Sequence, residues 1–286
     1  MFWKRFKILV LFLLIGFGIN QCSKNPQLPS IHYKPELVVF GILSPGSYEF
    51  KGKTLDGSLG RNFFVVQRTY QMDEKLVLQN FDSVSIFIDS VKLFPVGYVK
   101  REFYIQDSNY QSASDSTRVY SFDQKKFAIK PNMNYALRVN VPNYGSLRAN
   151  TLVPDSPAIL LPEDTVSYSQ KSITVKWTPV ESVGGYRVCI LVKDKRSNEE
   201  WPLIENEVSP ETQQYVVNLE PLWDLNHLET ISVEVQALDE NYANYLSLRN
   251  LFFSNCLTKD NFNIKGGYGL FGSMASTKKT LIFKTE

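Results

Sequence analysis

Hydrophobic and polar residues alternate in short runs along most of the chain, and turn-forming residues separate the runs. Because successive side chains of a strand point to opposite faces, this alternation is typical of half-buried β-strands. Proline and glycine mark turns between the runs, for example at Pro45-Gly46 and at Pro142-Asn143-Tyr144-Gly145. The first half of the chain therefore predicts strands at residues 37–43, 63–70, 84–93, 118–122, 135–141 and 147–153.

Three prolines, Pro154, Pro157 and Pro162, interrupt the strand pattern near the middle of the chain. We interpret this segment as a domain boundary, because proline and polar residues favour exposed connections. The alternation then resumes and predicts strands at residues 173–177, 185–192, 215–217, 231–237 and 281–283. Since no helix-period stretch separates the strands of the first half, parallel crossover units are not expected.

The fold class expected from this pattern is all-β, with two tandem β-sandwich domains at residues 36–155 and 160–286. A chain of 286 residues is too long for one small sandwich. Its aromatic share of 13% and its recurrent Val, Ile and Thr suit pleated, half-buried surfaces. The second half places Trp177 on an early strand and Tyr186 on the next, an order that resembles a fibronectin type III or immunoglobulin-like domain.

One segment of the second half has a helical period. Tyr242, Tyr245, Leu246 and Arg249 are spaced as on one face of a helix, which predicts a short amphipathic helix over residues 241–249, inserted before the last strand. In our preferred interpretation this stripe covers the outer sheet face near Cys189, because apolar stripes are usually buried. In the alternative, Tyr242 and Tyr245 contact a ligand or partner.

The N-terminus has the layout of a bacterial lipoprotein signal peptide. A basic start is followed by an apolar run at residues 8–19, which is shorter than the roughly 20 residues needed to span a bilayer. The sequence Ile19-Asn20-Gln21-Cys22 then resembles a lipobox, so we expect residues 1–21 to be removed, Cys22 to be lipidated and residues 22–35 to form a tether. The alternative is an ordinary secretory signal, with cleavage near residues 16–18.

Two further cysteines remain once Cys22 is assigned to the lipid. Cys189 and Cys256 could form a disulfide in an oxidising compartment, or they could be separate buried thiols. The alternation of residues 185–192 places Cys189 on the outer face of its sheet. Both interpretations stay open at this stage.

Charge and motifs restrict the possible functions. Without the three cations of the first seven residues, 28 of the 31 basic residues remain against 29 acidic ones, so nothing favours nucleic acid as a partner. The glycine motif at residues 267–272 matches a dinucleotide fingerprint, but only residues 273–286 follow it, and we expect a tight turn and bulge leading to the last strand there. Zinc and calcium motifs are absent, and neither His32 nor His227 lies in a catalytic motif. We therefore expect no catalytic residues, no metal and no cofactor.

Two tryptophans are the best candidates for contact with a ligand. Trp201 and Trp223 fall in segments predicted to be loops, where an exposed indole could stack on a sugar ring or anchor a protein partner. The alternative is that both side chains plug the ends of the sandwich.

Several segments together resemble a known family. They are the tethered start and residues 36–41 (ELVVFG), 135–139 (YALRV), 151–154 (TLVP) and 267–273 (GYGLFGS). In these segments the chain is similar to DUF4249-type outer-membrane lipoproteins of the Bacteroidota, in which DUF stands for domain of unknown function. The resemblance implies a lipid-anchored protein of the outer membrane, on its periplasmic or its surface side, that is often encoded beside a TonB-dependent transporter.

The function expected from these features is that of a non-catalytic binding or accessory module of the cell envelope. The resemblance implies an outer-membrane transporter as partner, and the tryptophans suggest a glycan. A structural or adhesive cell-surface protein is the alternative, and a glycan-acting enzyme is a less favoured one.

Overall fold

The computed structural model describes residues 34–48, 61–69, 80–101, 115–167, 171–194, 200–220, 228–249 and 262–284. The signal peptide, most of the tether and Cys22 lie outside these ranges. Residues Pro35–Glu286 form one compact unit. The described part is all-β apart from one short helix, as the sequence predicts.

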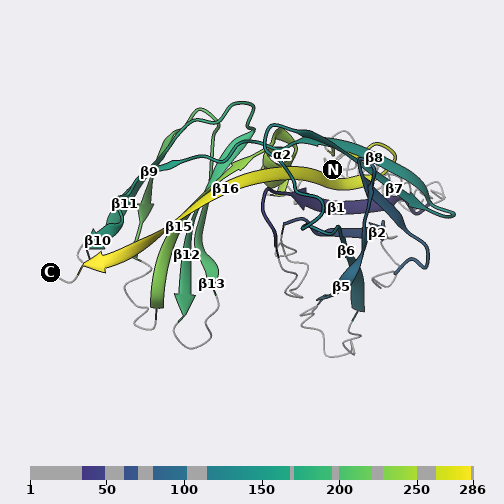
Figure 1. Ribbon diagram of the computed structural model, residues 1–286, viewed down its shortest axis with the longest axis horizontal. Coiled ribbons are helices and arrows are strands. Elements are labelled where there is room, and N and C mark those ends of the chain that lie inside the picture. Colours follow the sequence, from purple (N-terminus) through teal and green to yellow (C-terminus); the bar gives the residue numbers. More distant parts are fainter. Residues whose placement is uncertain are drawn as a thin grey trace, which may run out of the picture. The chain divides into compact units, whose positions relative to one another are not determined.

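Two sheets face each other in the first sandwich (Figure 1). One sheet contains β1 (Leu37–Leu43), β2 (Phe64–Arg68), β6 (Asp115–Ser121) and β5 (Phe94–Arg101), in that order. The other contains β4 (Val91–Lys92), β3 (Ser85–Ile88), β7 (Asn134–Val141) and β8 (Gly145–Leu152).

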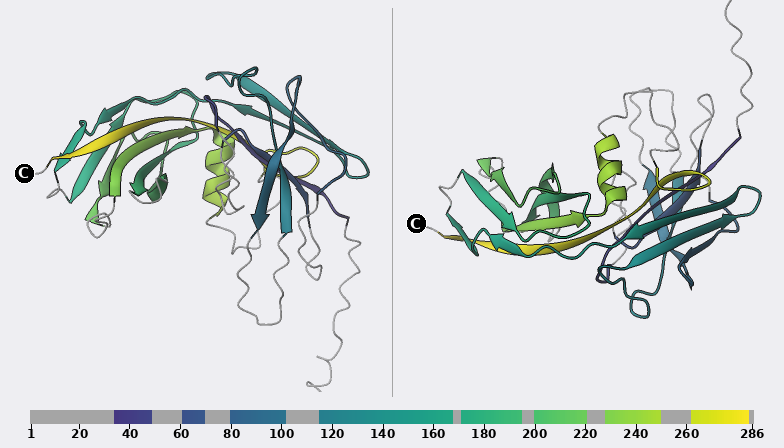
Figure 2. Two further views of the ribbon diagram at one scale, coloured as in Figure 1. Left: turned by 60° about the horizontal axis from the view of Figure 1, so that its bottom comes forward. Right: turned by 90° about the horizontal axis from the view of Figure 1, so that it is seen from above.

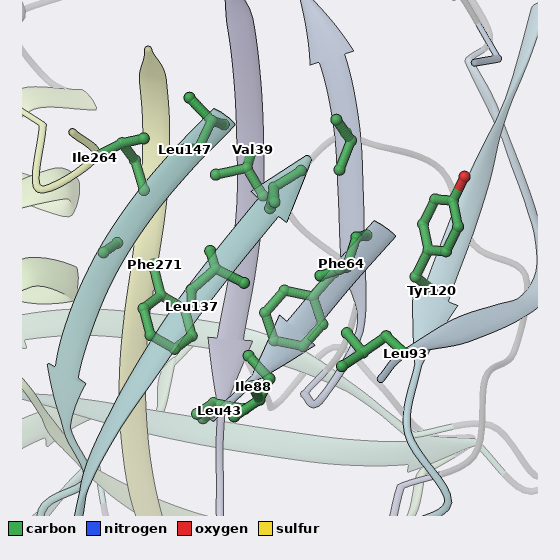
Figure 3. Close-up of a cluster of buried hydrophobic side chains, with 14 of the residues drawn as sticks. Val39, Leu43, Phe64, Ile88, Leu93, Tyr120, Leu137, Leu147, Ile264 and Phe271 are labelled. Carbon is green, nitrogen blue, oxygen red and sulfur yellow. The ribbon is translucent and has the colours of Figure 1, made fainter. Parts of the chain in front are cut away.

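Strict alternation builds the core between these two sheets. Every second residue of β7 is buried, so that Leu137 points inward together with Leu147 of the neighbouring β8. Figure 3 shows Leu137 near Phe64 and Phe271, which come from the facing sheet, and Leu147 nearer to Val39 and Ile264. The rings of Phe64 and Phe271 are 6.2 Å apart between centroids. This burial removes large apolar side chains from water and is the main stabilising term of the sandwich.

The second sandwich packs a sheet of three strands on one of five. The smaller sheet has the order β14 (Gln214–Asn218), β11 (Ser172–Trp177) and β9 (Ile159–Leu161). The larger has the order β13 (Glu200–Val208), β12 (Gly185–Asp194), β15 (Leu228–Leu238) and β16 (Tyr268–Lys284), and β10 (Thr165–Ser167) also pairs with β16. Trp177 and Tyr186 lie fully buried at its centre, with ring centroids 5.3 Å apart. This is the fibronectin type III-like arrangement that the sequence predicts.

The long strand β16 belongs to both sandwiches (Figures 1 and 2). Its first part, from Tyr268 to Ser273, pairs in parallel with β1, and its continuation, from Met274 to Leu281, pairs antiparallel with β15. The sheet of the first sandwich that contains β1 and the larger sheet of the second sandwich are therefore one continuous nine-stranded sheet. The predicted segment 160–286 thus contributes a strand to the first sandwich as well as building the second.

Three expectations for this region differ from the structure. The last strand, predicted at residues 281–283, has 17 residues. Most of the glycine motif is part of this strand rather than a turn, and Gly269 lies opposite Val39. Parallel pairs also occur, β1 with β16 and β10 with β16, between strands that are far apart in the sequence and not as local crossover units. They form because segments distant in the sequence meet side by side, which a search for crossover units does not detect.

The helix α2 (Glu240–Arg249) follows β15 directly and packs against the junction of the two sandwiches. Its buried residues, Tyr242 and Leu246, form a small apolar cluster with Leu270 and Met274 of β16. The predicted helix before the last strand is therefore present, one residue longer at its start.

Candidate functional site

A polar pocket lies where α2 begins, between the ends of β7 and β8 and the loop that precedes β12. Its volume is about 510 Å³, within the range of pockets that hold small molecules. Amide, hydroxyl and carboxylate side chains dominate the lining, which consists of Asn134, Asn150, Thr151, Leu152, Ser182, Val183, Gly184, Asp239, Glu240, Asn241 and Asn244.

Asp239 lies at the base of this pocket and accepts three hydrogen bonds there. One carboxylate oxygen accepts the backbone N–H of Tyr242 (3.0 Å) and that of Ser273 (2.9 Å), and the other accepts the hydroxyl of Thr151 (2.6 Å). The first of these bonds caps the N-terminus of α2, where a carboxylate is favoured. Because Thr151 belongs to the first sandwich and Ser273 to the shared strand, Asp239 joins three parts of the fold.

The amide side chains around the pocket fall into two groups. The first group, Asn241 and Asn263, binds the backbone around the pocket. Asn241 Nδ2 donates to Asn150 O (3.0 Å), and Asn263 Nδ2 donates to Phe271 O (2.6 Å). Within the described residues, the amide side chains of Asn134, Asn150 and Asn244 make no hydrogen bond to the protein. These three groups are therefore available to donate to and accept from a ligand.

A largely buried ion pair, with side chains 19% and 10% exposed, links Arg61, which lies just before β2, to the second sandwich. The Arg61 guanidinium pairs with the carboxylate of Glu234 on β15 and donates to Ser276 Oγ (2.6 Å) and to the Tyr48 hydroxyl (3.2 Å). Gln236 donates a further hydrogen bond to Glu234 (3.0 Å). Burial alone would raise the pKa of Glu234, but Arg61 and the hydrogen bonds hold it below its usual value.

Cys189 lies beside this ion pair, opposite Glu234 in the sheet. It is 1% exposed, and among the described residues its sulfur has no disulfide partner. Burial, with the nearby Glu234 and Glu205, raises the pKa of the thiol to about 12. The thiol is therefore protonated at neutral pH and unsuited to nucleophilic attack. Cys256 lies outside the described residues, so a bridge between the two stays a prediction.

The aromatic candidates from the sequence are used inside the fold wherever the structure describes them. Tyr242 is 7% exposed, and its hydroxyl accepts a hydrogen bond from Arg187 (3.3 Å), whose guanidinium also lies over the ring. Tyr245 packs edge-on against Phe40. Trp201 lies in β13 and not in a loop, and it is half-buried against the core of the second sandwich. Trp223 lies outside the described residues.

The residues that hold the pocket and its surroundings in place were not predicted from the sequence. Asp239, to which the sequence analysis assigned no role, is only 3% exposed. An aspartate directly before a helix-period segment is a capping signal that could have revealed its role. Arg61 and Glu234 are 173 residues apart, and no local pattern connects them.

Neither a metal centre nor a membrane-spanning helix is found in the described part of the chain. Across these residues, no group of three or more His, Cys, Asp or Glu side chains is placed to hold a metal ion. No helix among them is long and apolar enough to cross a membrane.

We expect Asp239→Ala to lower the free energy of unfolding by about 2 kcal/mol, because it leaves buried N–H groups without acceptors and removes a helix cap. Asp239→Asn retains an acceptor for both N–H groups and should cost less than about 1 kcal/mol. Urea unfolding monitored by circular dichroism measures the difference. Equal losses in the two variants would contradict the role given to the carboxylate oxygens.

Comparison with known proteins identifies a family but no close relative of known function. A family model described as a domain of unknown function (DUF4249) matches residues 83–280. No curated protein matches the chain. One similar solved structure is that of the chicken CNTN1 FN1–FN3 domains, at 13% sequence identity and a TM-score of 0.20. The match covers 70% of this chain and 60% of that one.

Proposed function

The chain belongs to the DUF4249 family, and from this premise we propose that it is a lipid-anchored, non-catalytic binding module of the bacterial cell envelope. The protein would then be an accessory protein that is anchored on the outer membrane and contacts an outer-membrane transporter. Its mature body is the two-sandwich unit, and its anchor is the acylated Cys22.

One observation carries the non-catalytic part of this proposal. Three buried reactive groups are already engaged within the protein. Asp239, in the pocket lining, accepts from three donors, and Glu234, outside the lining, pairs with Arg61. Burial keeps the Cys189 thiol, also outside the lining, protonated. What the pocket leaves available is the amides of Asn134, Asn150 and Asn244, the hydroxyl of Ser182 and the exposed carboxylate of Glu240. The amides bind polar ligands by donating and accepting hydrogen bonds, and no histidine or cysteine lines the described pocket to activate Ser182 as a nucleophile.

The N-terminal sequence supports the anchoring part. The apolar run at residues 8–19 and the lipobox-like residues before Cys22 are arranged as a lipoprotein signal requires. Each acyl methylene buried in a bilayer contributes about 0.8 kcal/mol, so two or more chains on one cysteine hold a water-soluble body firmly on a membrane. Residues 23–35 are long enough to let that body reach a neighbouring protein.

A cysteine substitution tests the anchor. We expect wild-type protein to incorporate radioactive palmitate and to fractionate with outer membranes, whereas Cys22→Ala should incorporate none and should leave the membrane fraction. Cys189→Ala serves as the matched control and should remain labelled and membrane-bound. A mature N-terminus downstream of Cys22, found by mass spectrometry, would contradict the proposal.

Affinity isolation tests the partner. We expect the protein, tagged at its C-terminus and taken from gently solubilised membranes, to bring down a β-barrel transporter in comparable amount. The Cys22→Ala variant should recover much less of this partner, because it is not held at the same surface. Recovery of the wild-type protein alone would count against an accessory role and favour a structural or adhesive one.

A further inference from the structure

A row of cationic side chains crosses the outer face of the four-stranded sheet. The register places Lys92 opposite Phe87, Phe87 opposite Arg138, and Arg138 opposite Arg148. An isolated bridge then places Lys265 opposite Arg148. Since neighbouring strands lie about 4.8 Å apart, the row extends over roughly 19 Å. Four of its five members carry a positive charge.

Strand alternation points this row away from the core. Leu137 and Leu147, the neighbours of Arg138 and Arg148, turn into the first sandwich (Figure 3). Arg138 and Arg148 are accordingly exposed, and so are Lys92 and Lys265. The guanidinium of Arg138 lies over the Phe87 ring, 5.5 Å from its centroid. This contact with the Phe87 ring stabilises the Arg138 side chain and limits its conformational freedom.

No carboxylate neutralises this row within the described ranges. The ion pairs found there involve none of the four cations. Asp89, two residues beyond Phe87, accepts the backbone N–H of Ala136 (2.9 Å). Like charges directly opposite each other destabilise a sheet, so the pair of Arg138 and Arg148 costs stability in the free protein. An anion bound across the row would offset this repulsion.

Hydrogen-bonding side chains border the row on both sides. One flanking row contains Ser85, Asn140 and Ser146, which line a second hollow of about 480 Å³. On the other side Asn150, opposite Ala136, leads to the pocket at the start of α2. The face therefore combines a central strip of cations with one amide and two hydroxyls on one side, and with the Asn150 amide and the Asp89 carboxylate on the other.

We propose that this face binds an acidic polysaccharide, with carboxylates of the sugar chain on the cation row and its hydroxyls on the flanking asparagines and serines. The inference deepens the proposed function by naming a ligand class, and it rests on the protein being a binding module. Arginine suits carboxylates because its guanidinium can donate two parallel hydrogen bonds. The flanking amides favour a sugar chain over an anionic membrane, since adsorption on lipid phosphates needs the cations alone.

The test uses the full-length protein, purified in a neutral detergent, and isothermal titration at low ionic strength. The probes are alginate oligosaccharides as the polyuronate, dextran as the neutral sugar, poly-L-glutamate, and vesicles that contain phosphatidylglycerol. We expect binding of alginate, no binding of dextran, and weaker binding of the other two probes. Added salt should weaken the alginate complex, because the row is exposed to solvent.

Charge-matched variants place the binding on the face. Arg138→Gln with Arg148→Gln should weaken alginate binding at least about tenfold, because hydrogen bonds to charged groups are lost. Lys126→Gln with Lys171→Gln removes the same charge from exposed positions elsewhere and should change the affinity less than about twofold. The melting temperature of the first pair should equal or exceed that of the wild type, since the like-charge contact is removed.

Three outcomes would overturn the proposal: absence of alginate binding, equal weakening by the two variant pairs, or tighter binding of vesicles or poly-L-glutamate than of alginate. If the central pair fails to fold, Lys92→Gln with Lys265→Gln removes the ends of the row and answers the same question. Because Cys22→Ala should bind alginate as the wild type does, loss of membrane anchoring and loss of glycan binding are distinguishable.

Discussion

Gly269→Ala is expected to lower the free energy of unfolding by about 4 kcal/mol or more, through backbone strain and forced overpacking together. Gly269 has a φ of +113°, a conformation that residues with a Cβ rarely adopt. A Cβ at this position would lie 1.8 Å from the carbonyl oxygen of Val39, its partner in the parallel pair of β1 and β16. Neither strand moves aside freely, because β1 is held on its other edge by β2, with Val39 opposite Val66, and β16 is held by β15 from Met274 onward.

Gly145→Ala is the matched control for this substitution. Gly145 has a similar φ of +102°, but a Cβ there would have no atom within 4 Å. It should therefore cost only the backbone strain, about 1–2 kcal/mol. Urea unfolding of the two variants separates collision from strain. Equal destabilisation would show that β1 and β16 do not approach as closely as described here.

Glu234→Leu is expected to cost about 2–4 kcal/mol, because it leaves the largely buried Arg61 guanidinium, whose side chain is 19% exposed, without a counter-ion. Arg61→Met together with Glu234→Leu should recover much of this loss, since two apolar residues can replace a buried ion pair. The exposed pair of Lys278 and Glu200 provides the control, and Glu200→Gln should cost no more than about 1 kcal/mol. An additive double variant would contradict the coupling of Arg61 to Glu234.

The same ion pair predicts a pH dependence with a definite sign. The folded-state pKa of Glu234 is below its usual value, so its contribution is complete above the unfolded-state pKa of about 4.3 and is lost as pH falls toward the folded-state pKa. The stability difference between the wild type and Glu234→Gln should therefore be constant from pH 6 to 7, roughly, and shrink below about pH 4. A difference that grows on acidification would contradict this ion pair.

Local patterns predicted most strands because their alternation reflects burial directly. The strand at residues 37–43 coincides with β1, and the one at 135–141 begins one residue late relative to β7. The segment 84–93, expected as one strand, is a hairpin of β3 and β4. Asp89 has a φ of +52° in its turn, and an aspartate at that conformation is compatible with a tight connection that apolar alternation does not reveal.

Long-range pairing explains most of what the sequence did not predict. β16 contains two glycines and two adjacent lysines, so its strand propensity is modest, and the strand forms because β1, β15 and β10 pair along it. The polar site depends on the same contacts. Asp239 reaches Thr151 across 88 residues, and the cation row exists only once β4, β3, β7 and β8 are in register.

The central claim is that a shared strand and buried polar contacts join the two sandwiches into one body with a preformed pocket. Calorimetry tests this claim most directly. β16 pairs in both sandwiches, and the contacts of Asp239 and of Arg61 with Glu234 connect them further. We predict a single unfolding transition whose calorimetric and van't Hoff enthalpies agree. Two separable transitions, one for each sandwich, would contradict the account.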